Sequence, residues 1–240
     1  MTRAEFKGEA VKTIGLIGGM SWESTVSYYR LINEMVKDRL GGFHSAKIVL
    51  YSVDFHEVEQ LQRAAKWEEA GELLAGAAHA VESAGADFLV LCTNTMHKVA
   101  DAIESSASIP LLHIADATAD KIKEAGARRV GLLGTQFTME EAFYRIRLQE
   151  KHGLDVLIPD EDERRIIHRV IYEELVHGKL IPGSRNEYRR IIANLVARGA
   201  EGIILGCTEI SMLVKADDST VPLFDTTCIH AAAAVARALA

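Results

Sequence analysis

Two segments of the chain read alike, and together they decide the fold: Ala84-Gly-Ala-Asp-Phe-Leu-Val-Leu-Cys-Thr93-Asn-Thr and Arg198-Gly-Ala-Glu-Gly-Ile-Ile-Leu-Gly-Cys207-Thr-Glu. They align without a gap, and each reads as a helix end, a buried strand and a polar strand end. The alignment pairs Thr93 with Cys207 and pairs Cys92 with a glycine. This self-similarity predicts two homologous halves.

The segments that flank this pair repeat as well. From the second glycine of each upstream copy to Thr93 and to Cys207, the intervals are 75 and 73 residues. Such nearly equal spacing indicates that each half carries the same series of elements. The upstream copies are Ile14-Gly-Leu-Ile-Gly18-Gly and Val130-Gly-Leu-Leu-Gly134-Thr, and the downstream copies are Ile109-Pro-Leu-Leu and Val221-Pro-Leu-Phe.

Short apolar runs alternate with stretches of helical periodicity along the whole chain. Alternating strands and helices predict parallel sheets that are covered on both faces. We therefore expect an α/β fold of two similar, pseudo-symmetric domains, each with a mainly parallel four-stranded sheet flanked by helices. The expected strands are Thr13–Ile17, Lys47–Val53, Phe88–Leu91, Leu111–His113, Val130–Leu133, Asp155–Ile158, Gly202–Leu205 and Leu223–Phe224. The expected helices are Ser24–Leu40, Trp67–Ser83, Ala115–Ala125, Met139–Lys151, Asp162–Val176, Arg185–Arg198 and Thr227–Ala240.

The repeat also sets the expected domain boundaries. Residues 12–110 form the first domain and residues 111–221 the second, while a C-terminal helix at 222–240 is expected to return to the first domain. Residues 1–11 are expected to be a flexible N-terminal extension. Helices are expected to end in left-handed caps at Gly41, Gly85, Gly126, Gly153 and Gly199.

The repeat places polar residues where strands end. In parallel sheets, ligands bind beyond the carboxyl ends of the strands, so we expect four strand-end loops to meet in one cleft between the domains. Thr93 and Cys207 would then face each other across it. Inversion at a carbon acid needs such a pair, because one group removes a proton while the other delivers one from behind. The expected loops are Gly18–Ser21, Thr93–Thr95, Gly134–Thr138 and Cys207–Glu209.

Cys207 suits the role of an acid/base group, because a thiol pKa of about 8.5 can be lowered by neighbouring dipoles. Thr93 carries an alcohol, which is a far weaker acid and needs strong activation. Cys92 is its neighbour, but adjacent side chains of a strand point to opposite faces. We therefore assign the pair to Thr93 and Cys207.

Other polar residues in these loops are candidate substrate contacts, each with a structural alternative. Asn94, Thr95 and Thr208 could satisfy turn backbones, and Thr138 could cap a helix. Glu209 could hold a substrate ammonium group or cap the next helix. The predicted substrate-binding residues are Met20, Ser21, Asn94, Thr95, Thr135, Thr138, Thr208 and Glu209.

Three motifs together resemble the cofactor-independent aspartate/glutamate racemase family: Ile14-Gly-Leu-Ile-Gly-Gly-Met-Ser-Trp-Glu-Ser-Thr, Cys92-Thr-Asn-Thr-Met-His97 and Leu205-Gly-Cys-Thr-Glu-Ile210. The resemblance covers the chain from about residue 12 and implies two similar α/β domains, a homodimer and catalysis without pyridoxal phosphate. It implies Cys207 as one acid/base group. The chain departs from most members at Thr93, which replaces a cysteine, as in a broad-specificity branch with a Thr/Cys pair. This departure predicts unequal racemisation in the two directions.

A second departure concerns the substrate. Aspartate-directed members carry an arginine just after the second strand, whereas this chain reads Ser52-Val-Asp-Phe-His56. Bidentate pairing of arginine with a carboxylate is hard to replace, so we expect a range beyond aspartate and glutamate, unless Arg63 or Arg145 reaches the substrate. The expected function is racemisation of these or a broader set of polar amino acids. The alternatives are a one-thiol lyase or decarboxylase of the same superfamily and a non-catalytic amino-acid-binding protein.

Composition excludes several classes of partner. The 240 residues include 27 basic and 34 acidic side chains, a net charge of −7, so nucleic acids and anionic membranes are poor partners. The three cysteines form no disulfide framework or CxxC motif, and no apolar run is long enough for a membrane span. These features predict a cytoplasmic protein. The nine histidines form no dense ligand motif, so no metal is expected.

Overall fold

The structure is a computed structural model that describes residues 11–240. Within this range, eight strands form two four-stranded sheets in which every paired strand is parallel, so the predicted fold class is confirmed. The expected N-terminal extension, apart from residue 11, lies outside the described residues. The strands are β1 (Ile14–Gly18), β2 (Ile48–Ser52), β3 (Phe88–Leu91), β4 (Leu111–Leu112), β5 (Arg129–Gly134), β6 (Asp155–Leu157), β7 (Gly202–Gly206) and β8 (Leu223–Asp225).

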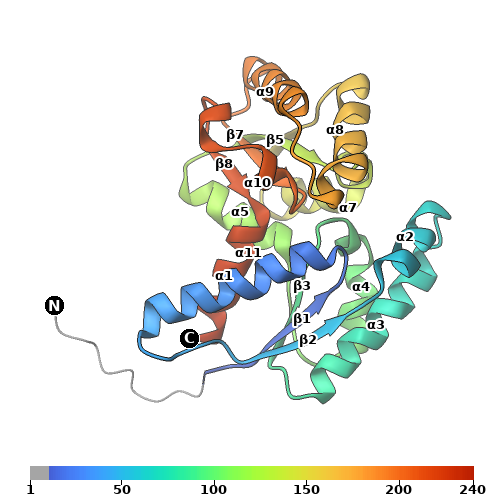
Figure 1. The fold of residues 1–240 in the computed structure, drawn as a ribbon, viewed down its shortest axis with the longest axis vertical. Coiled ribbons are helices and arrows are strands. Elements are labelled where there is room, and N and C mark those ends of the chain that lie inside the picture. Colours follow the sequence, from blue (N-terminus) through green and yellow to red (C-terminus); the bar gives the residue numbers. More distant parts are fainter. Residues whose placement is uncertain (1–10) are drawn as a thin grey trace.

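The helices are distributed over two lobes, the first built around the sheet of β1 to β4 and the second around the sheet of β5 to β8 (Figure 1). Those up to β4 are α1 (Trp22–Leu40), α2 (Phe55–Arg63), α3 (Trp67–Ser83), the 3-10 helix η1 (Thr95–Val99) and α4 (Ala100–Ser106). Those after β4 are α5 (Ile114–Glu124), α6 (Gln136–Glu140), α7 (Ala142–Ile146), the π-helix η2 (Arg147–Lys151), α8 (Glu161–Glu173), η3 (Leu175–His177), α9 (Pro182–Ala197), α10 (Ile210–Leu213), η4 (Ala216–Asp218) and α11 (Thr226–Ala238). Among the described residues, no helix combines the length and the apolar character that crossing a membrane requires.

The two sheets have the same topology, with strand orders β2-β1-β3-β4 and β6-β5-β7-β8. Their registers also match. Ile17 pairs with Leu91 in the first sheet, and Leu133 pairs with Leu205 in the second. These residues are equivalent in the sequence repeat, so the two halves of the chain fold in the same way.

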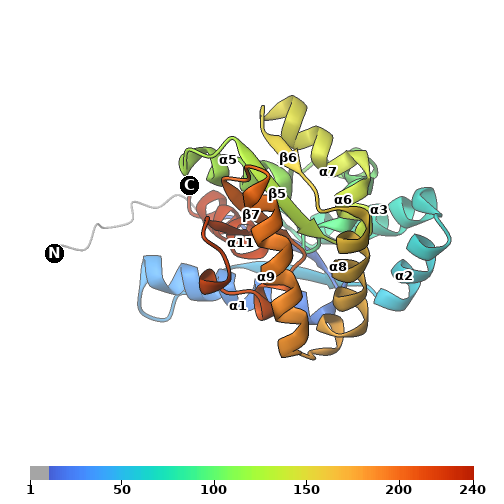
Figure 2. The same cartoon turned by 90° about the horizontal axis from the view of Figure 1, so that it is seen from above.

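The central strands are buried because helices cover both of their faces. In the first sheet, Ile14 and Leu16 pack with α1 and α11, whereas Ile17 packs in the cluster formed with α3 and α4. In the second sheet, Figure 2 shows α8 and α9 on one side and α5 on the other. This layering leaves the carboxyl ends of the strands to face the space between the lobes.

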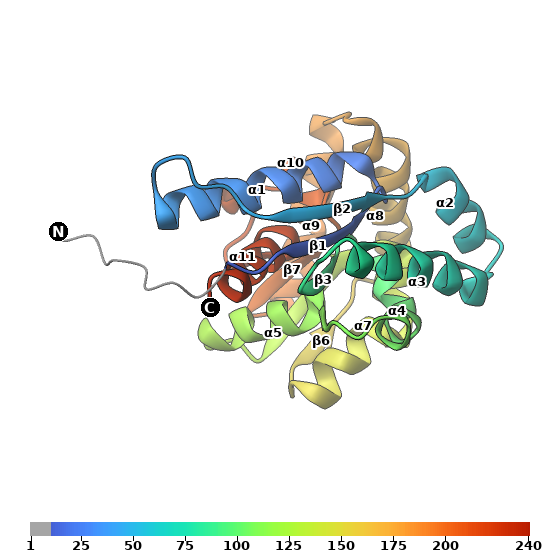
Figure 3. The same ribbon diagram turned by 90° about the horizontal axis from the view of Figure 1, so that it is seen from below.

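The helix that follows the last strand of each sheet packs against the other lobe. Helix α5 follows β4 but packs into the core of the second lobe, and α11 follows β8 but packs beside α1 of the first lobe (Figure 3). Tyr28 in α1 donates a hydrogen bond from its hydroxyl to Nδ1 of His230 in α11, at 2.9 Å. His230 donates from Nε2 to the carbonyl oxygen of Leu112, at 2.7 Å. The exchanged helices therefore tie the two lobes together.

The predicted single helix over Met139–Lys151 is wrong. The segment from Gln136 onward forms two short helices and a π-helix, because Glu141 adopts an extended backbone with φ −79° and ψ 152° between α6 and α7. The carboxylate of Glu141 forms an ion pair with Lys98 of η1, which fixes this break against the first lobe. Helices α2 and α4 were not expected.

All five glycines predicted to cap helices have positive φ angles, from 70° at Gly153 to 94° at Gly199. Gly41 differs from the predicted left-handed cap, because its ψ angle of −174° is extended, although its amide still donates to the Lys37 carbonyl oxygen. A residue with a side chain adopts such angles at a cost, so these positions end their helices with little strain only as glycine.

Candidate active site

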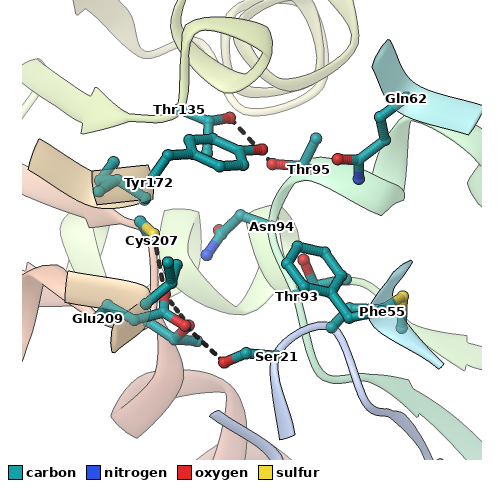
Figure 4. A pocket seen from close by; sticks show the side chains of 15 residues that line it. Ser21, Phe55, Gln62, Thr93, Asn94, Thr95, Thr135, Tyr172, Cys207 and Glu209 are labelled. Atoms are coloured by element: carbon teal, nitrogen blue, oxygen red, sulfur yellow. Dashed lines mark hydrogen bonds between the residues drawn. The ribbon is translucent and has the colours of Figure 1, made fainter. Parts of the chain in front are cut away.

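A pocket lies where the carboxyl ends of β1, β3, β5 and β7 face one another (Figure 4). The four expected strand-end loops all contribute to it, together with residues of α2, α8 and η3. The lining residues are Met20, Ser21, Phe55, Gln62, Thr93, Asn94, Thr95, Thr135, Ile171, Tyr172, Val176, Gly206, Cys207, Thr208 and Glu209.

Nine of the ten residues predicted for the site line this pocket, and Thr138 is the exception. Its hydroxyl lies one layer behind the wall, 3.3 Å from the hydroxyl oxygen of Thr95 and 3.1 Å from that of Thr135. Thr135 is the residue that caps α6, since its side chain accepts a hydrogen bond from the Thr138 amide. The three hydroxyls therefore form a cluster that joins η1 of the first lobe to α6 of the second.

Cys207 follows β7 directly, and its side chain is buried at the pocket wall. Its thiol donates a hydrogen bond to Oε2 of Glu209, at 3.0 Å. Burial and the negative charge of the Glu209 carboxylate raise the pKa of the Cys207 thiol well above its ordinary value. At neutral pH, Cys207 therefore keeps its proton.

Glu209 lies at the centre of a hydrogen-bond network that crosses the two lobes. Its Oε1 accepts from the hydroxyls of Ser21, at 2.8 Å, and Ser24, at 2.7 Å. Its Oε2 accepts from Thr208, at 2.7 Å, and from the Cys207 thiol. A carboxylate has about four acceptor positions, and all of them are occupied. The side chain makes no capping hydrogen bond to α10, although Glu209 stands at its N-terminus.

Thr93 follows β3, and Figure 4 shows it on the opposite wall from Cys207. Its hydroxyl makes no hydrogen bond to any residue in the described range 11–240. His97 holds the backbone instead, since its Nδ1 donates to the Thr93 carbonyl oxygen at 2.7 Å while its Nε2 accepts from the Ile114 amide at 3.2 Å. Burial lowers the pKa of His97 well below its ordinary value, so this imidazole is neutral.

Two amide side chains in the wall carry unpaired carbonyl oxygens. Asn94 donates from Nδ2 to the Thr226 hydroxyl at 3.0 Å, and Gln62 donates from Nε2 to the Met96 sulfur at 2.9 Å. Neither Oδ1 of Asn94 nor Oε1 of Gln62 has a partner among the described residues, although both atoms are buried. A buried acceptor without a donor is unfavourable, so these atoms are suited to a ligand that brings hydrogen-bond donors.

Sequence reasoning missed the lining residues that come from helices. Phe55 and Gln62 come from α2, while Ile171, Tyr172 and Val176 come from α8 and η3. These residues lie on helices rather than at strand ends, and the repeat does not mark them. The one local signal was Asp54, which caps α2 by accepting a hydrogen bond from the His56 amide at 3.0 Å.

Neither arginine considered as a carboxylate partner lines the pocket. Arg63 pairs with Glu59 at 2.6 Å on the surface, where its side chain is 81% exposed. Arg145 donates to the carbonyl oxygen of Glu140 at 3.0 Å. Among the lining residues in the described range, Glu209 is therefore the only charged one.

The other two cysteines lie outside the pocket. Cys92 is fully buried on the face of β3 that packs against α1 and α11, and burial raises its pKa. Cys228 is partly buried near the start of α11, and burial raises its pKa as well. Across residues 11–240, no cluster of three or more His, Cys, Asp or Glu side chains is placed to hold a metal ion.

Comparisons with known proteins agree with this geometry. Residues 17–234 match the family model described as Asp/Glu/hydantoin racemase. The broad-specificity amino-acid racemase RacX of Bacillus subtilis (strain 168) is 23% identical, over 95% of this chain and 98% of RacX. A solved structure from Yersinia pestis, described as a candidate Asp/Glu racemase, is 59% identical with a TM-score of 0.91, over 95% of this chain and 100% of that chain. An aspartate racemase homologue from Pyrococcus horikoshii OT3 is 36% identical with a TM-score of 0.82, over 95% and 99% of the two chains.

Proposed function

This chain belongs to the Asp/Glu/hydantoin racemase family, and from that premise we propose that it inverts the α-carbon of an amino acid by proton transfer on two faces. Cys207 serves one face and Thr93 the other, and the reaction uses no pyridoxal phosphate. One observation carries the proposal: the Cys207 thiol is hydrogen-bonded to a buried carboxylate in a pocket whose opposite wall contains Thr93.

On the Cys207 face, the thiol and Glu209 act together. Glu209 takes the thiol proton along the 3.0 Å hydrogen bond, which leaves a thiolate to remove the α-proton of the substrate. The substrate's ammonium group brings a positive charge that favours this ionised state. In the reverse direction, the protonated thiol delivers its proton to the carbanion.

The remaining wall residues hold the groups common to all amino acids. The unpaired Oδ1 of Asn94 accepts a hydrogen bond from the ammonium group, and the hydroxyls of Thr95 and Thr135 donate to the α-carboxylate. The hydroxyl of Thr208 keeps its hydrogen bond to Glu209. These donors also stabilise the negative charge that develops as the α-proton leaves. Thr138 supports Thr95 and Thr135 from behind.

On the Thr93 face, the hydroxyl has no base beside it within the described residues. It can supply a proton and regain one from solvent, but it removes a proton poorly because an alcohol is a weak acid. The enantiomer whose α-proton faces Thr93 should therefore be converted more slowly than its mirror image.

The test is incubation of the protein with L- and D-amino acids in heavy water without added cofactor. Proton NMR measures loss of the α-proton signal, and chiral chromatography measures the product. We expect α-deuterium in the product and unequal rates for the two enantiomers. Product that stays fully protiated would exclude direct two-base exchange.

The free hydroxyl of Thr93 also supports a second candidate, a lyase or decarboxylase that needs one protonating thiol. Release of carbon dioxide from an α-carboxylated acid, with inactivity on amino acids, would favour it. A binding protein is distinguished by ligand affinity that survives Cys207→Ser while the unmodified chain exchanges no α-proton.

We also propose that the protein forms a homodimer, and helix α1 supports this assembly. Trp22, Val26 and Tyr29 lie on one face of this helix, and each side chain is more than half exposed. We expect sedimentation equilibrium to give twice the mass of one chain, and Val26→Glu to weaken the association. A single-chain mass at all concentrations would contradict the dimer.

A further inference from the structure

We propose that Gln62 selects the substrate's side chain, so that the pocket prefers amino acids whose side chain ends in an uncharged hydrogen-bond donor, an amide or a hydroxyl, over those that end in a carboxylate. This inference rests on the proposed racemase function and names its substrate class.

The orientation of the Gln62 amide is set by its neighbour. Its nitrogen lies 2.9 Å from the sulfur of Met96, and a thioether sulfur can only accept a hydrogen bond. The N–H end must therefore face Met96, which leaves the oxygen directed to the pocket (Figure 4). Gln62 is only 5% exposed, so solvent does not satisfy that oxygen, and a ligand donor is the partner it lacks.

The charges around the pocket disfavour a second carboxylate. The only charged lining residue in the described range is Glu209, which is itself negative. Arg63 follows Gln62 in the sequence, but its guanidinium is paired with Glu59 on the surface. Within the pocket that holds Cys207 and Thr93, a distal carboxylate near Gln62 would meet an acceptor oxygen and no cationic lining residue of the described range, and a buried charge without a partner is strongly unfavourable. Arg63, Arg165 and Arg169 line a separate, neighbouring hollow that Gln62 also borders.

The walls beside Gln62 suit the aliphatic part of such a side chain. Phe55 from α2 and Ile171, Tyr172 and Val176 from the second lobe line the same pocket as Gln62. These groups can contact methylene groups between the α-carbon and the terminal donor. The site thus combines an apolar passage with one acceptor at its end.

The experiment compares substrates of matched shape by α-deuterium exchange: glutamine, glutamate and methionine, and asparagine, aspartate and leucine. We expect kcat/KM to be at least tenfold higher for the two amides than for the matching acids. Gln62→Met should lower the ratio of glutamine to methionine turnover by at least tenfold, because it removes the acceptor at nearly constant length. Gln60→Met, on the exposed side of the same helix, should leave that ratio unchanged.

Two further measurements separate the possible failures. Gln62→Glu keeps the acceptor, so it should retain the amides and reject the acids further, and calorimetry should show wild-type binding of glutamine over glutamate. Equal or better use of the acids by the unmodified protein overturns the inference, as does a uniform loss for every amino acid in Gln62→Met. Selective binding without α-exchange in any amino acid instead contradicts the racemase and supports the selectivity of Gln62.

Discussion

The walls that carry Cys207 and Thr93 occupy equivalent places in the two halves, but they are built differently. The residue two positions after Cys207 is Glu209, whose carboxylate accepts a hydrogen bond from the Cys207 thiol. The residue two positions after Thr93 is Thr95, whose hydroxyl bonds to other hydroxyls. One wall therefore pairs an acid with a base, and the other pairs an alcohol with alcohols.

The difference shows that the sequence repeat determines where Thr93 and Cys207 lie, while residues of the opposite lobe determine the hydrogen bonds around each wall. Glu209 of the second lobe receives hydrogen bonds from Ser21 and Ser24 of the first. Thr95 of the first lobe contacts Thr135 and Thr138 of the second. Equivalent backbone registers bring both walls together, but different partners across the interface give them unequal strength as proton acceptors.

Removing the Cys207 thiol should have the largest effect on activity, because it removes the acid/base group of the stronger wall. Cys207→Ala should reduce formation of the α-deuterated product by on the order of 10⁴-fold from either enantiomer, since each conversion needs a proton transfer at this face. The measurement is deuterium incorporation by NMR. The matched control is Cys92→Ala, a buried cysteine outside the pocket, which should retain activity within about twofold. Equal losses in the two variants would remove the distinction between the walls.

Replacing the carboxylate tests whether Glu209 makes the Cys207 wall the stronger one. Glu209→Gln should slow exchange by roughly 10²-fold, because the thiol loses its proton acceptor. The same change removes a negative charge that raises the pKa of Cys207, so the thiol of the variant should ionise at a lower pH. The rise of the remaining activity with pH should therefore shift to lower pH than in the unmodified protein. A pH–rate profile checks both effects. A profile displaced to higher pH would contradict the electrostatic role of Glu209.

Installing a thiol on the weaker wall should reduce the difference between the walls. Thr93→Cys should raise the conversion of the slower enantiomer by about tenfold, because a thiol ionises far more readily than an alcohol. Initial rates from pure L- and D-substrates measure the change. Thr93→Ser keeps an alcohol and is the control, which should preserve the original inequality. If Thr93→Cys slows both directions, Thr93 has a role other than proton transfer.

The sequence predicted the features that depend on local and repeated patterns. Apolar strands bounded by glycine, together with the matched spacing to Thr93 and Cys207, were enough to predict two equivalent sheets and a shared site. The positive φ angles of the five capping glycines followed from the same local chemistry.

The features that were missed depend on contacts between segments far apart in the chain. Gln62 and Tyr172 reach the pocket from helices on different lobes, and no spacing in the sequence connects them. Ser24 bonds to Glu209 across 185 residues of sequence, so its role emerges only when the lobes meet. Glu141 likewise interrupts a predicted helix at a position where it pairs with Lys98 of the other half.

The smallest expected effect concerns stability at the Thr93 wall, where buried imidazoles pack together. His97, which holds the Thr93 carbonyl oxygen, has its ring centroid 4.4 Å from that of His113 and 6.0 Å from that of His230. Burial lowers the pKa of His113 to about 3 and that of His230 to about 4, from an ordinary value of 6.5. All three histidines are therefore neutral in the folded protein at mildly acidic pH.

Acid should weaken this wall because the unfolded chain binds protons that the folded chain excludes. Below about pH 6.5, and down to about pH 4 for His230, each such histidine should lower the free energy of unfolding by about 1.4 kcal/mol per pH unit. His230→Gln removes one titrating group, so its unfolding free energy should fall less steeply between pH 6 and pH 5 in urea titrations. If the slope for His230→Gln equals that of the unmodified protein, His230 is protonated in the folded state, which would contradict a neutral imidazole cluster at the Thr93 wall.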